Sequence, residues 1–204
     1  YYLRSCLMNS TMQPAAGIGW KYSSYFQHWK GAFWVQYNEW SDFGFHNDDT
    51  GDSGYGSFRA IKDIARKLFD PNASPALKLQ DENTKIWVKA QYDDVDPDHY
   101  TWCGWETVSG QKYGAIWRYQ YGDVGGTNWD RNYYTVDYGV DRDFKAKGNL
   151  SSMSTSFYRF TITSGSAVLN SCTETASASY SSQDDITTFN IPDVRENPTI
   201  IKFN

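Results

Sequence analysis

The chain has 204 residues, of which 40% are hydrophobic, and its 19 basic and 24 acidic side chains give a net charge of −5. This acidic balance, without a basic cluster, argues against binding nucleic acid through its phosphates. No segment contains the about 20 apolar residues that a membrane-spanning helix needs, so we expect no transmembrane segment. The length fits a single β-rich domain, residues 1–204, that can bury a core without disulfides.

Aromatic residues are frequent, with 16 Tyr, 11 Phe and 9 Trp, and they recur in short alternating runs. Residues 1–20 are weakly periodic, and we interpret them as a strand followed by an irregular arm. Residues 31–40 alternate well and predict a strand. Residues 47–56 are rich in Gly, Ser and Asp, which indicates a loop.

One helix is predicted over residues 57–69. Ser57 can cap its start, and Asp70-Pro71 marks its end. The apolar positions Phe58, Ile61, Ile64, Ala65 and Leu68 follow the helical period, so we expect them to pack on a sheet. The opposite face would expose Lys62, Asp63, Arg66 and Lys67.

The remainder of the chain alternates as strands do. We expect strands at 85–92, 100–108, 112–121, and near 132–140, 155–163, 166–171, 184–191 and 198–203. The run 171–182 is rich in Ser and Thr and is either a flexible loop or an exposed edge strand. Many short strands, turn signals between them and one helix predict a mainly β fold: an antiparallel sandwich or jelly roll, or else a closed barrel.

The segment 119–134 is the strongest candidate for a ligand site. It places a Gly-rich tip between two aromatic strands, with Trp and Tyr beside Asp and Asn. A sugar offers C–H bonds to an aromatic ring and hydroxyl groups to carboxylates and amides, so this composition suits a carbohydrate. The alternative is a structural hairpin in which Trp129 folds back over the end of the sheet. The candidate ligand-binding residues are Trp117, Tyr119, Tyr121, Asp123, Asn128, Trp129, Asp130 and Tyr133.

An acidic turn lies at residues 93–98. Asp94, Asp96 and Asp98 alternate there, and Pro97 stiffens the turn. Crowded carboxylates repel one another, and a calcium ion with oxygen ligands would relieve that repulsion. The segment does not match an EF-hand loop, and a solvated acidic loop is the alternative. Calcium is therefore the candidate cofactor.

Cysteines and glycosylation motifs bear on the compartment. Cys6, Cys103 and Cys172 lie far apart in sequence, so we expect one disulfide and one remaining thiol, with three buried thiols as the alternative. Acceptor motifs for N-glycosylation occur at Asn9, Asn72 and Asn149. These motifs favour an extracellular, secreted protein.

Three functions remain open from the sequence. The favoured hypothesis is a secreted, lectin-like domain that binds a glycan or another cell-surface ligand, with calcium as a candidate cofactor. The second is a structural, attachment or membrane-interface subunit of a larger assembly, such as a homo-oligomer. The third is a polysaccharide hydrolase, for which Glu39 and Glu106 are the candidate carboxylates. Binding is favoured over catalysis.

Overall fold

The computed structural model describes residues 3, 4, 7, 56–70, 72–74, 77–79, 85–95, 98–119, 139–163 and 166–204. It contains the helix α2 (Gly56–Phe69) and nine strands in these residues: β1 (Lys85–Val95), β2 (Asp98–Glu106), β3 (Lys112–Tyr119), β4 (Val140–Lys147), β5 (Thr155–Thr163), β6 (Ser166–Ser171), β7 (Ser177–Ser181), β8 (Ile186–Val194) and β9 (Thr199–Phe203).

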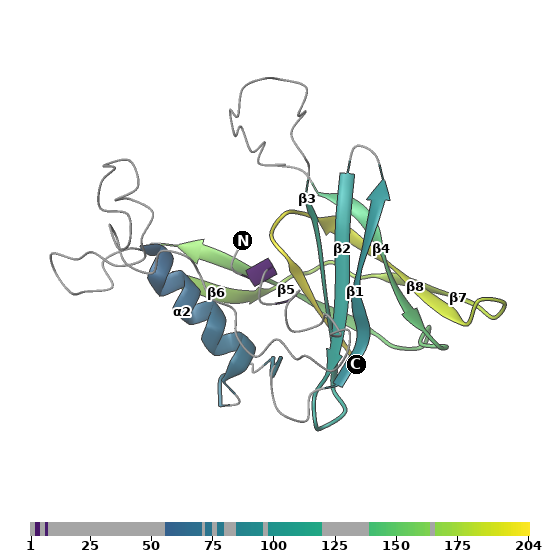
Figure 1. Ribbon diagram of the computed structural model, residues 1–204, viewed down its shortest axis with the longest axis horizontal. Coiled ribbons are helices and arrows are strands. Elements are labelled where there is room, and N and C mark those ends of the chain that lie inside the picture. Colours follow the sequence, from purple (N-terminus) through teal and green to yellow (C-terminus); the bar gives the residue numbers. More distant parts are fainter. Residues whose placement is uncertain are drawn as a thin grey trace, which may run out of the picture.

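The strands form two open antiparallel sheets, in the orders β1-β2-β3-β9-β5-β6 and β4-β8-β7 (Figure 1). The mainly β prediction is therefore confirmed. The closed-barrel alternative is not confirmed, because within the described residues the larger sheet ends at β1 and β6 and the smaller one at β4 and β7. The strand order does not confirm a jelly roll.

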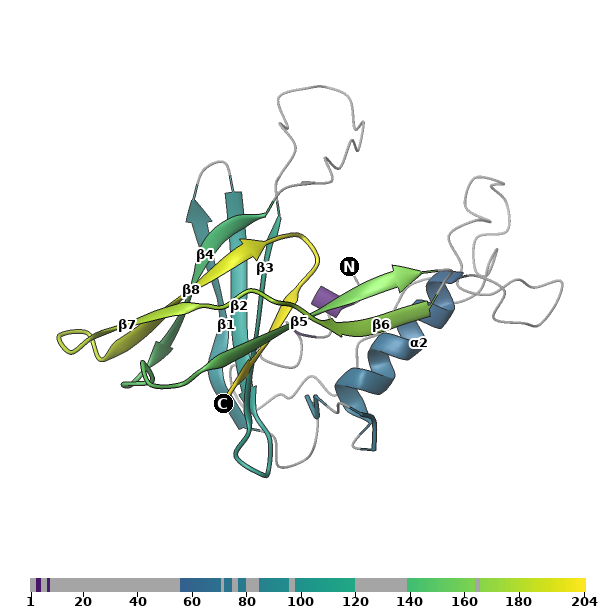
Figure 2. The ribbon, with the colours of Figure 1, turned by 180° about the vertical axis from the view of Figure 1, so that it is seen from behind.

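One apolar core lies between the two sheets, where the smaller sheet crosses β1, β2 and β3 (Figure 2). At its centre the Phe203 ring lies between Phe144 and Phe189, with ring centroids 5.3 and 5.0 Å away. The Trp102 indole N–H on β2 donates to the carbonyl oxygen of Lys145 on β4, at 3.1 Å. Among the described residues, aromatic side chains from both sheets thus fill the core between them.

A second core covers the opposite face of the larger sheet, where α2 packs beside β6. Ile64 and Leu68 are buried, as the helical period predicted. The chain then returns beneath the helix, so that the N–H of Leu77 donates to the carbonyl oxygen of Lys67 at 2.9 Å. The Trp105 indole donates to the Leu77 carbonyl at 2.7 Å, which ties this return to β2.

Several elements differ from the sequence prediction. β4 extends to Lys147 although the predicted strand stopped at 140. For the run 171–182, the edge-strand alternative is confirmed, since β7 lies at the edge of the smaller sheet. β1 carries two register shifts, one between Ile86 and Val88 and one between Val88 and Gln91. Leu3 and Leu7 have a helical backbone where a strand was expected, while the predictions for 31–40 and 132–138 lie outside the described residues.

The shifts in β1 change which side chains face the core. Strict alternation along a strand would place Trp87 and Val88 on opposite faces, yet both contact the core between the sheets. The Trp87 indole crosses β2 at Gly104 and donates to the carbonyl oxygen of Tyr113 at 2.9 Å. A Cβ atom at Gly104 would lie 2.6 Å from the indole nitrogen, so this crossing requires glycine.

The expected disulfide is not found at Cys103 or Cys172. These two residues contact opposite cores, so the larger sheet separates their sulfur atoms. Cys6 lies outside the described residues. In the part of the chain that the structure describes, no helix has the length and hydropathy to cross a bilayer.

Candidate functional site at the hairpin end

Four strand ends meet at one end of the two packed sheets, which we call the hairpin end. There β1 turns into β2 with Val95 paired to Asp98, and Tyr119 at the end of β3 pairs with His99. β4 begins beside them, at the top of Figure 1. The segment 120–138 connects β3 to β4, so both of its chain ends lie here. The acidic turn and the aromatic segment, predicted separately, therefore belong to the same end of the fold.

The structure places few of the predicted ligand-binding side chains. Trp117 is only 1% exposed and packs in the core on the α2 side of the sheet, so its ring is not an exposed stacking surface. Tyr119 is placed by its backbone alone. The remaining candidates lie outside the described residues: Tyr121, Asp123, Asn128, Trp129, Asp130 and Tyr133.

The acidic turn is placed by its backbone. Asp94 pairs with His99, and Asp98 pairs with Val95, while Asp96 and the side chains of Asp94 and Asp98 lie outside the described part. Among the side chains that are described, no group of three His, Cys, Asp or Glu could hold a metal ion. The calcium site stays a prediction.

Tyr92 is a surface residue that the sequence analysis missed. Its side chain is 62% exposed, and it lies in one cross-strand row with Thr101 and Trp117. Continuing the alternation predicted for 85–92 would have placed Tyr92 with the buried Val88, but the register shifts of β1 break that alternation. The available signal was an aromatic ring directly before the acidic turn.

A buried phenol stiffens the base of the hairpin end. The Tyr100 hydroxyl donates to Asp93 Oδ2 at 3.3 Å, and its ring stacks on Trp102 with centroids 5.3 Å apart. The Arg142 guanidinium of β4 lies over the same ring, 5.7 Å from its centroid. Burial, and then the Asp93 carboxylate, raise the pKa of Tyr100 to about 12. Tyr100 therefore stays a hydrogen-bond donor at neutral pH.

An ionic cluster joins the two sheets near the same end. The Arg159 guanidinium of β5 donates to Glu174 Oε1 at 2.8 Å and to Asp193 Oδ2 at 3.1 Å. Its Nε donates to Thr199 Oγ1 at 3.0 Å, and Arg195 Nε donates to Asp193 Oδ1 at 2.9 Å. The backbone N–H of Glu174 and the Arg159 guanidinium lower the pKa of the Glu174 carboxyl. Arg159 thus connects β5, β8, β9 and the β6–β7 connection.

The start of β4 fits closely against this cluster. Asp193 has a φ of 54°, and its backbone N–H donates to Asp141 Oδ1 at 3.3 Å. A Cβ atom at Gly139 would lie 2.6 Å from the Asp193 Cα atom, so only glycine fits. The N–H of the buried Arg118 donates to the carbonyl oxygen of Arg195 at 3.0 Å. Both anchor points of the segment 120–138 are therefore held by specific contacts.

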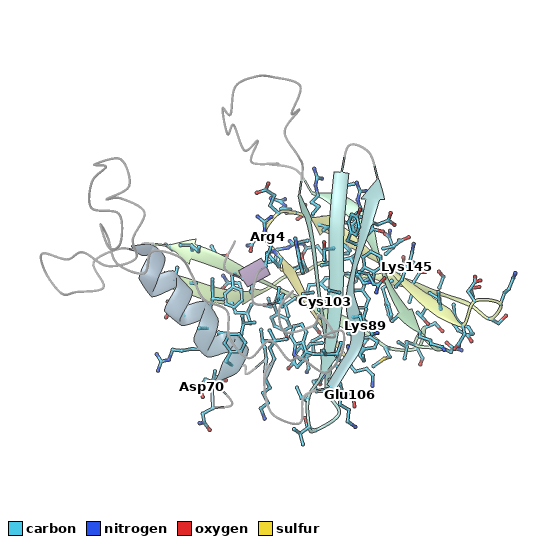
Figure 3. All side chains as sticks on the ribbon, viewed as in Figure 1. Arg4, Asp70, Lys89, Cys103, Glu106 and Lys145 are labelled. Carbon is cyan, nitrogen blue, oxygen red and sulfur yellow. The ribbon has the colours of Figure 1, made fainter. Side chains whose placement is uncertain are left out.

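The other predicted residues lie elsewhere. Glu106 is at the opposite end of β2 (Figure 3), where Lys112 Nζ lies 2.7 Å from its carboxylate. Glu39 and Asn9 are outside the described residues. Asn72 and Asn149 are exposed, and the Asn149 Oδ1 accepts a hydrogen bond from the Ser151 hydroxyl at 2.8 Å.

Comparison of the chain with models of protein families, with curated proteins and with solved structures finds no match.

Proposed function

We propose that this protein is a secreted binder of carbohydrate and that its ligand sits at the hairpin end. One observation carries the proposal: the exposed Tyr92 ring lies beside the acidic turn, at the end of the sandwich where the segment 119–134 leaves β3. An exposed ring offers a stacking surface to the C–H face of a sugar, and carboxylates accept hydrogen bonds from its hydroxyl groups. Tyr92 takes the role for which Trp117 was predicted.

The surroundings of Tyr92 support this role. The hydrogen bond from Tyr100 to Asp93 and the stacking of Tyr100 on Trp102 fix the strands beneath it. Binding residues on segments held by a rigid β scaffold are a common arrangement, because the scaffold reduces the ordering cost of binding. In this proposal Trp129, Asn128 and Asp130 complete the site from the segment 119–134. Calcium held by Asp94, Asp96 and Asp98 orders the acidic turn.

The test is glycan binding by the full chain. A glycan array identifies a ligand, and titration calorimetry then compares Tyr92→Ala and Trp129→Ala with the natural protein. Loss of one stacking ring should weaken binding about tenfold, which corresponds to about 1.4 kcal/mol. Val108→Ala is the matched control, because Val108 is also exposed, at 60%, but lies beyond the opposite end of β2.

Each outcome has one meaning. Weakened binding in both ring variants and unchanged binding in the control support the proposal. Unchanged affinity in both ring variants, or an array on which nothing binds, would show that it is wrong. Loss of binding in EDTA that calcium restores supports the calcium site, whereas full binding in EDTA removes calcium from the proposal and leaves the sugar site standing.

A further inference from the structure

β7 is an edge strand without a protective feature. Its residues Ser177–Ser181 read Ser-Ala-Ser-Tyr-Ser, none of them is buried, and its pairing with β8 has no register shift. Natural edge strands usually carry charges, proline or bulges, or are covered, because their unpaired N–H and C=O groups invite another strand. β7 itself carries no charge, proline or bulge, and its outer edge has no strand or backbone partner among the described residues.

The three other sheet edges are each protected. β1 has two register shifts and exposed lysines at 85 and 89. β4 reads Val-Asp-Arg-Asp-Phe-Lys-Ala-Lys. It carries three successive charged side chains near its start and a lysine at every second position in its second half. β6 lies beside α2, and the Asp63 carboxylate accepts the N–H of Ala167 at 3.0 Å. Since the chain blocks three edges by three different means, the open fourth edge indicates a partner strand.

Side-chain hydrogen bonds fix the turn at the end of β7, which leaves the strand ordered before any partner binds. The Tyr180 hydroxyl donates to Asp185 Oδ1 at 2.9 Å, and the Ser181 hydroxyl donates to Asp184 Oδ2 at 2.8 Å, which fixes the turn into β8. The β7–β8 hairpin projects beyond β1, β2 and β3, at the right of Figure 1. A second strand can therefore approach without meeting the larger sheet, and little ordering is needed when it binds.

We propose that β7 pairs in antiparallel fashion with β7 of a second copy of this chain, with Ser179 at the two-fold axis. This register places Ser177 opposite Ser181 and Ala178 opposite Tyr180, and Ser179 faces its own copy. No charged side chains meet, and each copy presents the same patch to the other, as a two-fold interface requires. A charged partner strand would find no complementary charge on β7.

The side-chain pattern fits this pairing on both faces. Ala178 and Tyr180 lie opposite the buried Phe189 and Thr187 of β8, so they share the core-side face of the smaller sheet. Across the two-fold axis they would extend that face with an apolar pair, and the serines would line the solvent face. The two small sheets would become one six-stranded sheet. A five-residue strand pair is a small interface, so we expect a dissociation constant on the order of 10 µM.

The first experiment measures self-association of the full chain by sedimentation velocity from low to high micromolar concentration. The natural protein should shift from monomer to dimer. Ser179→Lys and Ser179→Glu should each remain monomeric, because like charges would then face each other at the axis. An equimolar mixture of the two variants should recover the dimer. Unchanged thermal unfolding of each variant shows that the fold is intact.

The second experiment tests the register by disulfide formation. In Ser179→Cys the two Cα atoms would lie about 4.5–5.5 Å apart, within the range of a disulfide. In the matched control Ser177→Cys they would lie about 14 Å apart, from an offset of four residues at about 3.3 Å each and the spacing of about 5 Å between the strands. Under mild oxidation Ser179→Cys should therefore form covalent dimers at least about tenfold faster than Ser177→Cys.

The proposal is wrong if the natural chain stays monomeric throughout, which would leave β7 to another occupant. It is also wrong if a dimer forms and Ser179→Lys leaves it intact, or if the two cysteine variants crosslink equally fast. None of these readouts depends on whether the protein binds a sugar.

Discussion

Replacement of Phe203 by alanine tests whether the two sheets share the core described above. β9, which carries Phe203, is the last strand in sequence but lies between β3 and β5 in the larger sheet. Its ring is only 1% exposed, and its centroid lies 5.1 Å from Trp87, 5.3 Å from Phe144 and 5.0 Å from Phe189. Three ring contacts from three other strands therefore meet at one side chain.

The expected loss follows from this burial. Truncating a buried phenylalanine to alanine costs about 3–5 kcal/mol, because the transfer energy is lost and a cavity remains. In a protein of this size each kcal/mol lowers Tm by about 2–4 °C, so Phe203→Ala should unfold roughly 10 °C lower. Phe203→Leu keeps most of the volume and should cost about 1.5 kcal/mol or less. Urea unfolding followed by tryptophan fluorescence measures the free energy of unfolding of both variants.

The exposed Val108 provides the control, since Val108→Ala should change stability by no more than about 0.5 kcal/mol. If Phe203→Ala costs less than about 1 kcal/mol, or no more than Val108→Ala, the smaller sheet does not pack on β9 and the reasoning is refuted.

Three further predictions follow from other parts of the structure. Gly139→Ala should destabilise the protein by about 1–3 kcal/mol in urea unfolding, because its Cβ would overlap Asp193; a neutral result would contradict that close fit. The pKa of Tyr100 is raised to about 12, so its contribution to the free energy of unfolding is complete below pH 10 and is lost as the pH rises toward 12. This loss of stability at alkaline pH should be smaller in Tyr100→Phe. An equal loss in both proteins would be evidence against the buried phenol. Expressed in a eukaryotic secretory host, the chain should carry a glycan at the exposed Asn149 that Ser151→Ala removes, as mass spectrometry of the peptide would show or deny.

Local sequence patterns predicted several elements correctly. The strands at 155–163 and 166–171 match β5 and β6, and the helix at 57–69 begins one residue earlier in the structure. β3 also alternates as the strand prediction implies, because Tyr113, Ala115 and Trp117 face the α2 side and Ile116 faces the smaller sheet. These features depend on residues close together in the chain, where periodicity and turn residues carry the signal.

The same patterns failed where contacts between residues far apart in the chain decide strand formation or burial. β4 has one large apolar side chain, Phe144, among charged residues, and it is a strand because it pairs with β8. Trp117 was expected at a surface, but the layer formed with α2 covers its face of the sheet. Its alternation in β3 was correct, yet alternation does not say which face will be covered.

The sequence by itself determined that the chain forms short antiparallel strands, the helix after residue 56 and an aromatic-rich core, because side-chain periodicity is a local property. Only the tertiary structure decided that Trp117 is buried and Tyr92 exposed, that the acidic turn and the segment 119–134 share one end, and that β7 alone among the four described edges is left open. Burial of a face and pairing of an edge depend on which distant segments pack against them, and the order of residues along one strand does not contain that information.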